Sequence, residues 1–357
     1  MNYTSQELNA IVLDSFEKIT YKVKQEITEN FRFSVPRKKY EGFLIKTLGE
    51  GVYNKVREQF FSEEYRRQVV SSLEKLRITC VTYFSENYPE NFRNIPAPPL
   101  VLYCRGNADL LKRRAFAIVG SRHTLPKVLK DTAEISSRLA EKFVIVTGTA
   151  DGGDTAAAEG AVASGNLIFF AAQGLGYRYP ASNARLYRRA EEKGLVISEQ
   201  RPNVRASGYL FPVRNRLIAA LADGVLIVSA GEKSGAAITA EYAFEYGKDV
   251  FCFPYSVGVP SGVGCNRLIK KGAYLTENIL DISEAYGLDF TPRVRPVLTE
   301  REKEVLSSIQ SRGEAHVSQV AADVGCNAFE LLAELSSLEV KGLIIRLGGN
   351  RYAAADQ

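Results

Sequence analysis

Short apolar runs alternate with longer amphipathic segments through the middle of the chain. The runs occupy 115–119, 144–147, 167–172, 195–198, 224–229 and 250–253. Each is too short for a helix and lacks polar alternation, as expected of strands buried on both faces of a sheet. The segments between them have helical length. This alternation predicts an α/β fold with a Rossmann-like, doubly wound and mostly parallel sheet over 81–290.

The first 80 residues are charged and have a helical period. Apolar side chains on one face of the first predicted helix are Leu8, Ile11, Val12, Phe16 and Ile19. This pattern predicts a small N-terminal helical domain over 1–80, of the SAM-like type, with a break at Ser34-Val35-Pro36. Residues 81–110 contain Pro96, Pro98 and Pro99 and are expected to be irregular.

A proline-containing segment, 291–296, predicts a stiff linker to a last domain over 297–357. In that domain, Thr299 and Glu302 form a capping-box pair at the start of a helix. Two more helices and a hairpin around Gly348-Gly349-Asn350 are expected, which together predict a winged helix.

The third helix of this domain contains Glu330, Glu334 and Glu339. Carboxylates there would repel phosphate, which favours a protein-contact or regulatory role over duplex DNA binding. Arg346 and Arg351 on the hairpin leave duplex binding open.

Glycine-bearing loops follow the apolar runs of the central region, at 120–122, 147–154, 173–176 and 234–239. In an open parallel sheet, such loops gather at the carboxyl ends of the strands, where helix N-termini favour anions. The chain has neither a GxxxxGK[ST] loop nor a GxGxxG motif after the first strand. A nucleotide cofactor is therefore not expected.

Arginine is concentrated in the segment 201–216, and no acidic residue occurs between Glu199 and Asp223. A basic segment with aromatic residues, next to a phosphate-binding edge, is typical of proteins that bind single-stranded nucleic acid. The alternative is a solvated, basic start of a helix.

Composition adds constraints on the class of protein. The chain has 357 residues, 45% of them hydrophobic, and a formal net charge of +5, which permits nucleic-acid binding without requiring it. Without an apolar run of about 20 residues or a signal-peptide pattern, a cytoplasmic protein is expected. Five scattered cysteines and two histidines predict neither a metal site nor a disulfide framework.

The order and spacing of several motifs resemble those of the DprA/Smf family of DNA-processing proteins. The motifs are 118–122, Thr147-Gly148 with Gly153-Asp154, Tyr179-Pro180, 197–199, 211–219, Ser234-Gly235 with Thr239-Ala240, and 266–273. The resemblance extends from about residue 81 to the C-terminus. It implies a homodimer that binds single-stranded DNA and loads the RecA recombinase during natural transformation.

On this resemblance, we expect the DNA-binding residues to be Gly120, Ser121, Arg122, Thr147, Gly148, Gly174, Phe211, Arg214, Asn215, Arg216, Ser234 and Gly235. The expected dimer interface is Tyr274, Leu275, Ile279, Leu280 and Ile282. Arg122 could bind a phosphate in bidentate fashion or pair with Glu199. Phe211 could stack on a base or merely pack at the start of its helix.

The second glycine loop departs from the family pattern. Asp151 stands where the family usually carries an arginine, and Gly153 stands in place of an isoleucine. A specialised relative is therefore possible. A nucleotide-processing enzyme is the alternative, because Ser234-Gly235 followed by Thr239-Ala240-Glu241 loosely resembles a loop of nucleoside-monophosphate phosphoribohydrolases. Glu241 and Asp151 would then be the acid–base candidates.

Overall fold

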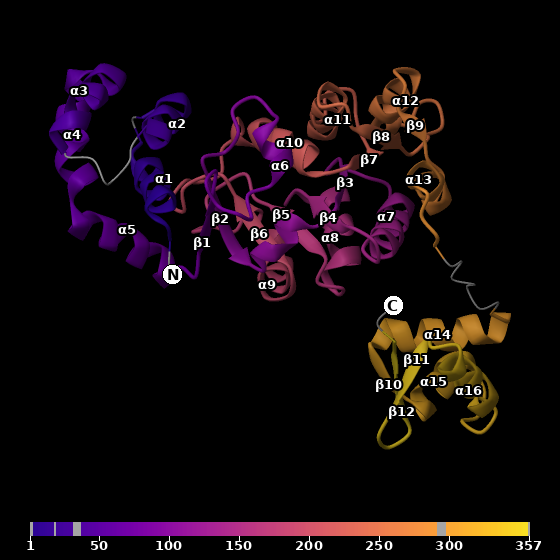
Figure 1. Ribbon diagram of the computed structural model, residues 1–357. Coiled ribbons are helices and arrows are strands. Elements are labelled where there is room, and N and C mark those ends of the chain that lie inside the picture. Colours follow the sequence, from indigo (N-terminus) through magenta and orange to yellow (C-terminus); the bar gives the residue numbers. More distant parts are fainter. Residues whose placement is uncertain (1–2, 18, 31–36, 291–297, 356–357) are drawn as a thin grey trace. The chain divides into compact units, whose positions relative to one another are not determined.

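The computed structural model describes residues 3–17, 19–30, 37–290 and 298–355. The chain divides into two compact units, Met1–Phe290 and Thr291–Gln357 (Figure 1). The predicted break at 34–36 and the predicted linker at 291–296 lie outside the described residues.

A nine-stranded sheet forms the centre of the first unit, in the order β1-β2-β6-β5-β4-β3-β7-β8-β9. The predicted runs form β3 (Ala115–Gly120), β4 (Val144–Thr147), β5 (Leu167–Phe170), β6 (Leu195–Ser198), β7 (Gly224–Ser229) and β8 (Asp249–Cys252). All neighbouring pairs among these strands are parallel. The predicted Rossmann-like, mostly parallel sheet is confirmed.

Residues 81–110 were expected to be irregular, but a strand lies at each end of this range. Strand β1 (Thr79–Thr82) pairs antiparallel with β2 (Val101–Gly106), which pairs antiparallel with β6. The prolines lie between the two strands, where they interrupt no ladder of hydrogen bonds. At the opposite edge, the short strand β9 (Tyr274–Leu275) pairs with β8.

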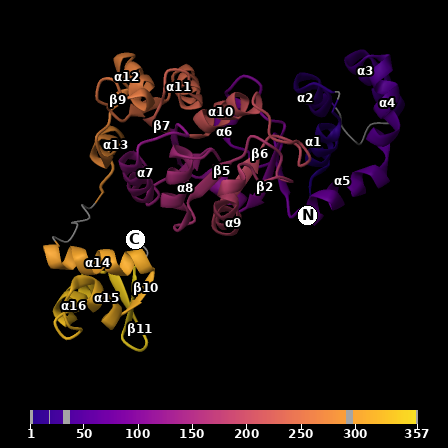
Figure 2. The same cartoon turned by 180° about the vertical axis from the view of Figure 1, so that it is seen from behind.

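Helices cover both faces of the sheet, and each face has its own core (Figures 1 and 2). Ala117 and Val119 of β3 pack in the core that contains α10 (Leu210–Leu221) and α11 (Gly235–Glu245). Phe116 and Ile118 pack in the opposite core. That core contains α7 (Pro126–Leu139), α8 (Gly153–Val162), α9 (Ala184–Lys193) and α13 (Ile279–Tyr286). Alternate side chains of one strand therefore serve two layers. The short helix α6 (Glu90–Arg93) and helix α12 (Val263–Lys270) complete the unit's helices after β1.

The described residues before the sheet form α1 (Ser5–Ser15), α2 (Tyr21–Asn30), α3 (Arg37–Leu48), α4 (Glu50–Phe61) and α5 (Glu63–Lys75). They share a small core that includes Val12, Leu13 and Phe60. Ala10 and Ile11, on another part of α1, belong to the core between the sheet and helices α7, α8, α9 and α13. The hydroxyl of Tyr103 also donates a hydrogen bond to Asp14 (2.7 Å). Helix α1 thus packs both on the small core of the N-terminal helices and on one face of the sheet.

The second unit contains α14 (Glu300–Arg312), β10 (Glu314–His316), α15 (Val317–Val324), α16 (Leu332–Val340), β11 (Ile344–Leu347) and β12 (Arg351–Ala354). Thr299 and Glu302 form the predicted capping box at the start of α14. Strands β11 and β12 form an antiparallel hairpin, and β10 pairs with β12. Over residues 298–355 the unit therefore consists of three helices beside a small antiparallel sheet, with its own apolar core.

Candidate nucleic-acid interface

A cleft of about 900 Å³ opens where the strand order of the sheet reverses. The chain leaves β3 toward β4 on one side, and it returns through α10 to β7 on the other side. The loops after β3 and β7 therefore diverge, leaving a crevice at the carboxyl ends of the strands, the usual ligand position in such folds. The cleft is lined by 119–125, Ala150, Asp154, Phe211, Arg214, Asn215, Gly231, 233–236, Thr239, Pro260 and Ser261.

The loop after β3 forms one wall of the cleft. A Cβ atom at Gly120 would lie 3.0 Å from the Cα of Gly153, so this loop can approach α8 only with glycine there. The Ser121 N–H donates to the carbonyl of Ser229 (3.0 Å), and the hydroxyl of Thr124 donates to the carbonyl of Ser121 (2.9 Å). The loop is thus tied to the end of β7.

Arg122 is exposed on this wall, and its guanidinium carbon lies 5.5 Å from the centre of the Phe211 ring. Among the described residues, no carboxylate oxygen lies within 4.0 Å of its nitrogens, so the predicted alternative of a pair with Glu199 does not form. The charge of Arg122 is therefore available to a ligand, next to an aromatic ring.

Helix α10 contributes Arg214 and Asn215 to the floor of the cleft. Arg214 is 5% exposed, and it donates hydrogen bonds to the carbonyl of Phe170 and to Oδ1 of Asn215. The side-chain amide of Asn215 in turn donates to the carbonyl of Gly235 (3.0 Å). These two side chains hold α10 against the neighbouring loops and add positive charge beneath the surface.

Asp154, the second residue of α8, is buried beneath the same floor. Its Oδ1 accepts a hydrogen bond from Gly120 N–H (3.3 Å) and its Oδ2 accepts one from Ala150 N–H (3.4 Å). Burial raises the pKa of Asp154 to about 6, although Arg214 and these hydrogen bonds act in the opposite direction. A Cβ atom at Gly148 would lie 2.1 Å from Asp154 Oδ2 and 2.7 Å from Arg214 Nη2. Gly148 therefore makes room for both charged groups.

The N-terminus of α11 forms the remaining wall. The Ser234 hydroxyl accepts a hydrogen bond from Ala237 N–H (3.3 Å), so this side chain caps the helix. The exposed Lys233 precedes it, and the adjacent Glu232 is paired with Arg267 (2.8 Å). A free cation beside a helix N-terminus is unfavourable unless an anion binds there.

The sequence interpretation missed Lys233 and Asp154, which line the cleft, and Ser229, which holds the loop after β3. A weak signal existed for each of them. Ser229 ends an apolar run, Lys233 lies in a glycine loop, and Asp154 follows two glycines.

Several expected site residues lie away from the cleft. Thr147 is buried and its hydroxyl donates to the carbonyl of Ile118 (2.6 Å). Gly174 lies under the 201–204 loop, since its Cβ atom would meet the Arg201 carbonyl oxygen at 1.8 Å. Arg216 turns away from Arg214 and forms an ion pair with Glu199, because helix positions two apart face different directions.

The enzyme alternative loses its acid–base pair in this structure. Neither Glu241 nor Asp151 is among the residues that line the cleft, and both side chains are exposed. Asp151 accepts a hydrogen bond from the hydroxyl of Ser182 (2.6 Å). Both carboxylates face solvent, and Asp151 also contacts a neighbouring loop.

The expected dimer residues divide into exposed and buried side chains. Tyr274, Leu275 and Leu280 are 52%, 50% and 58% exposed, and Ile279 is partly buried. Ile282 is fully buried in the core of its own chain, so it offers no surface to a second copy. Ile282 is therefore removed from the expected interface.

Neither a metal centre nor a membrane span was found in the part of the chain that the structure describes. There, no group of three or more His, Cys, Asp or Glu side chains is arranged to hold a metal ion. No helix among these residues has the length and apolar character needed to cross a bilayer.

Comparisons with known proteins agree with the motifs. The family model of DNA recombination-mediator protein A matches residues 79–287. The protein is 35% identical to a DNA processing protein DprA of Mycobacterium tuberculosis over 277 residues, which is 72% of this chain and 71% of that protein. It is 38% identical to the DNA processing protein DprA of Streptococcus pneumoniae over 196 residues, covering 55% and 70% of the two chains.

Solved structures show the same relationship. The crystal structure of DprA from S. pneumoniae matches with a TM-score of 0.66 and 29% identity, over 82% of this chain and all (100%) of that one. DNA processing protein A from Helicobacter pylori, studied for its binding of single-stranded DNA, matches with a TM-score of 0.54 and 32% identity. That match covers 59% of this chain and 97% of the other. The fold, the ordered motifs and these matches together show that the chain belongs to the DprA family of DNA-processing proteins.

Proposed function

We propose that the cleft binds single-stranded DNA. The observation that carries this proposal is the position of Arg122, an exposed guanidinium without a carboxylate partner, over the ring of Phe211 at the mouth of the cleft. Lys233 adds a second cation on the opposite wall, and no carboxylate of the described residues lies within 4.0 Å of it. Cations for phosphates beside a ring for bases are the two elements that single-strand binding requires.

The arrangement favours a single strand over a duplex or a free nucleotide. A ring can stack only on a base whose face is exposed, and paired bases in a duplex do not offer one. The cleft has no glycine loop of the nucleotide-binding kinds. The H. pylori relative, which binds single-stranded DNA, supports the same choice.

The proposal extends to the role that the family resemblance implies. The protein would act in the cytoplasm without a cofactor, protect incoming DNA, and load the RecA recombinase in natural transformation and homologous recombination. The same cleft residues Gly120, Ser121, Arg122, Phe211, Asn215, Ser234 and Gly235 would contact DNA, with Arg214 acting from beneath. Thr147, Gly148 and Gly174 would act by shaping the loops.

A homodimer is part of the proposal. Tyr274 and Leu275 lie on β9, an edge strand whose outer side pairs with no described strand, and Leu280 lies on the adjacent α13. Exposed apolar side chains on a free edge are a common site of self-association. The second unit would be a winged helix with a protein-contact role, since Glu334 of α16 and Glu330, which precedes that helix, place carboxylates there and form ion pairs with Arg301.

Fluorescence anisotropy with a labelled 20-mer, its duplex and a nucleoside monophosphate, each at two salt concentrations, tests the proposal. We expect the single strand to bind most tightly, with an affinity that falls as salt rises. Arg122→Ala should weaken binding without lowering the melting temperature. Equal affinity for all three ligands, or release of free base from the monophosphate that Glu241→Gln abolishes, would overturn it.

A further inference from the structure

Two exposed tyrosines lie on the loop that follows β5, beside the cleft but outside it. Tyr177 and Tyr179 are 39% and 41% exposed. The ring of Tyr179 lies 5.9 Å from that of Phe211, and the Arg205 guanidinium lies 5.5 Å from the centre of the Tyr177 ring. We call Tyr177, Tyr179 and Arg205 the aromatic shelf.

One residue of the shelf, Tyr179, lines a hollow that continues into the cleft. A second hollow of about 420 Å³ is lined by Arg122, Phe211, Tyr179 and residues 206–208. Arg122 and Phe211 also line the cleft itself. A nucleic-acid strand that leaves the cleft past Phe211 would therefore reach Tyr179 next along the surface.

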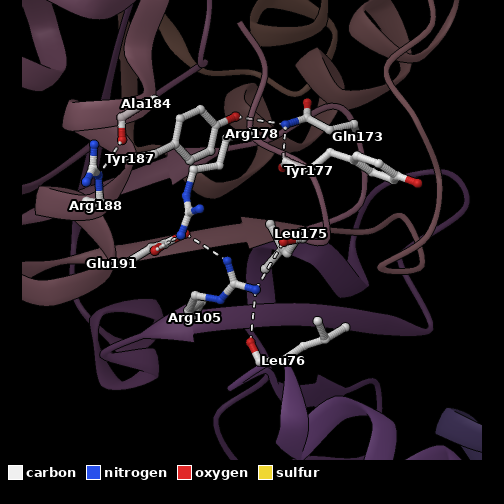
Figure 3. A network of polar contacts seen from close by, with 10 residues as sticks. All are labelled: Leu76, Arg105, Gln173, Leu175, Tyr177, Arg178, Ala184, Tyr187, Arg188 and Glu191. Atoms are coloured by element: carbon white, nitrogen blue, oxygen red, sulfur yellow. Dashed lines mark hydrogen bonds and ion pairs between the residues drawn. The ribbon is translucent and has the colours of Figure 1, made fainter. Parts of the chain in front are cut away.

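Hydrogen bonds hold the loop of the shelf in place (Figure 3). The Gln173 side-chain amide donates to the carbonyl of Tyr177 (3.3 Å) and to the hydroxyl of Tyr187 (2.9 Å). The Tyr187 hydroxyl donates in turn to the carbonyl of Tyr179 (2.9 Å). On the other side of the loop, Gly176 N–H donates to the carbonyl of Pro202 (2.9 Å). The backbone at both tyrosines is thereby fixed.

Two ion pairs of Glu191, one of them with Arg178 between the two tyrosines, strengthen this support (Figure 3). Glu191 of α9 accepts from Arg178 (2.8 Å) and from Arg105 (2.8 Å), and Arg105 also donates to the carbonyl of Leu175 (3.0 Å). Burial of Glu191 opposes its ionisation, but the two arginines outweigh burial and lower the pKa of Glu191. Because Arg178 is engaged here, its charge holds the loop and is not free for a ligand.

Arg205 differs from Arg178 in this respect. Among the described residues, no carboxylate oxygen lies within 4.0 Å of its guanidinium, and the side chain is exposed. No acidic residue occurs in the sequence from Gln200 to Ala222. The shelf thus combines two exposed rings, carried on a hydrogen-bonded loop, with an available cation. Because the backbone of this loop is held before binding, less conformational entropy is lost when a base stacks on its rings.

We propose that single-stranded DNA continues from the cleft onto the aromatic shelf, with bases stacked on Tyr179 and Tyr177 and a backbone phosphate on Arg205. The proposal rests on single-strand binding in the cleft and adds a second segment to the path. Any base can stack on a tyrosine ring. The shelf should therefore raise the affinity for longer strands, whatever their base sequence.

The test compares oligothymidylates of increasing length, dT6, dT12 and dT20, by fluorescence anisotropy. Affinity of the unaltered protein should rise between dT6 and the longer strands. Tyr177→Ala should weaken dT20 binding by at least about fivefold, the lower end of the range for losing one stacked base, and leave dT6 binding unchanged. Arg205→Ala should lower the log–log salt slope for dT20 by about 0.7.

Matched controls separate stacking from other effects. Tyr177→Phe keeps the ring and should bind dT20 like the unaltered protein. Arg113→Ala removes an exposed arginine that precedes β3, at the amino end of the strands, and should change neither affinity nor slope. The series is repeated in Leu280→Lys, so that bridging of two protomers by a long strand is not mistaken for the shelf.

Each outcome has a defined meaning. If no oligonucleotide binds, the cleft proposal itself fails. If dT6 and dT20 bind the Tyr177→Ala variant as they bind the unaltered protein, the shelf is not on the DNA path, while the cleft remains. If the variant loses dT6 and dT20 binding equally, Tyr177 belongs to the primary site and the extension is wrong. Unchanged DNA binding with loss of RecA binding would assign the shelf to a protein partner.

Discussion

Arg214 and Asp154 lie together under the floor of the cleft, with their charged groups on either side of Gly148. Burial raises the pKa of Asp154 to about 6, and it lowers the pKa of Arg214. The cation therefore persists near neutral pH, while the carboxylate is close to gaining a proton. The charge beneath the DNA-binding surface depends on pH for this reason.

This pair leads to a pH prediction. As pH falls from about 7.5 to 5.5, Asp154 becomes neutral, the charge of Arg214 is less compensated, and single-strand affinity should rise. Asp154→Asn should abolish the rise. Because the imidazole of His123 also lines the cleft, both measurements are made by anisotropy in the His123→Gln background. A rise of equal size with Asp154→Asn would contradict the assignment.

The same shift has a consequence for stability. The folded-state pKa lies above the ordinary value of 3.8, so the folded protein binds more protons than the unfolded chain between about pH 4 and 6. The contribution of Asp154 to the free energy of unfolding is therefore fully present below about pH 4, and it is lost as pH rises through about 6. Urea unfolding of the unaltered protein and of Asp154→Asn across this range checks the sign.

Alanine substitution of Arg122 should affect DNA binding, whereas alanine substitution of Arg216 should affect stability. Arg122→Ala is expected to weaken single-strand binding and to lower the salt slope by about 0.7, with little change in stability. Arg216→Ala leaves Glu199 buried without its partner and should lower the free energy of unfolding by about 3 kcal/mol. Urea denaturation and a salt titration of each variant distinguish the two; weaker DNA binding by a fully stable Arg216→Ala would return Arg216 to the site.

Asp151 offers a gain-of-function test. If the second glycine loop borders the DNA path, Asp151→Arg removes a repulsive charge and adds an attractive one. Tighter binding is expected, with a salt slope steeper by up to about 0.7. The substitution also removes the hydrogen bond from Ser182, and Ser182→Ala is the control for that loss. A lower melting temperature with an unchanged slope would show that Asp151 only anchors the loop.

The dimer surface can be tested without disturbing the core. Leu275→Lys with Leu280→Lys places charge on two exposed positions and should yield a monomer in sedimentation at micromolar concentration. Ile282→Lys should instead unfold the protein, since its side chain is fully buried. A dimer that persists in the double variant would place the interface elsewhere.

Local patterns were enough to predict six strands of the central sheet, β3 to β8, but not β1, β2 and β9. Runs such as 144–147 and 224–229 became strands because apolar residues without alternation can be buried only between two layers. Glycine loops after these strands met at one edge because parallel strands all end there. The helix cap at Thr299 was likewise readable, since a cap depends on neighbouring residues alone.

The direction of individual side chains was decided by the tertiary structure. Arg214 and Arg216 share a short segment, yet the phase of α10 turns one to the cleft and the other to Glu199. Ile282 has the same apolar character as Leu280, but only Ile282 meets the core beneath the sheet. The periodicity of the sequence determined which side chains share a face of a helix or strand. Whether that face contacts the core, a carboxylate or the cleft was decided by the tertiary structure, because the contacting residues are distant in the chain and only packing brings them together.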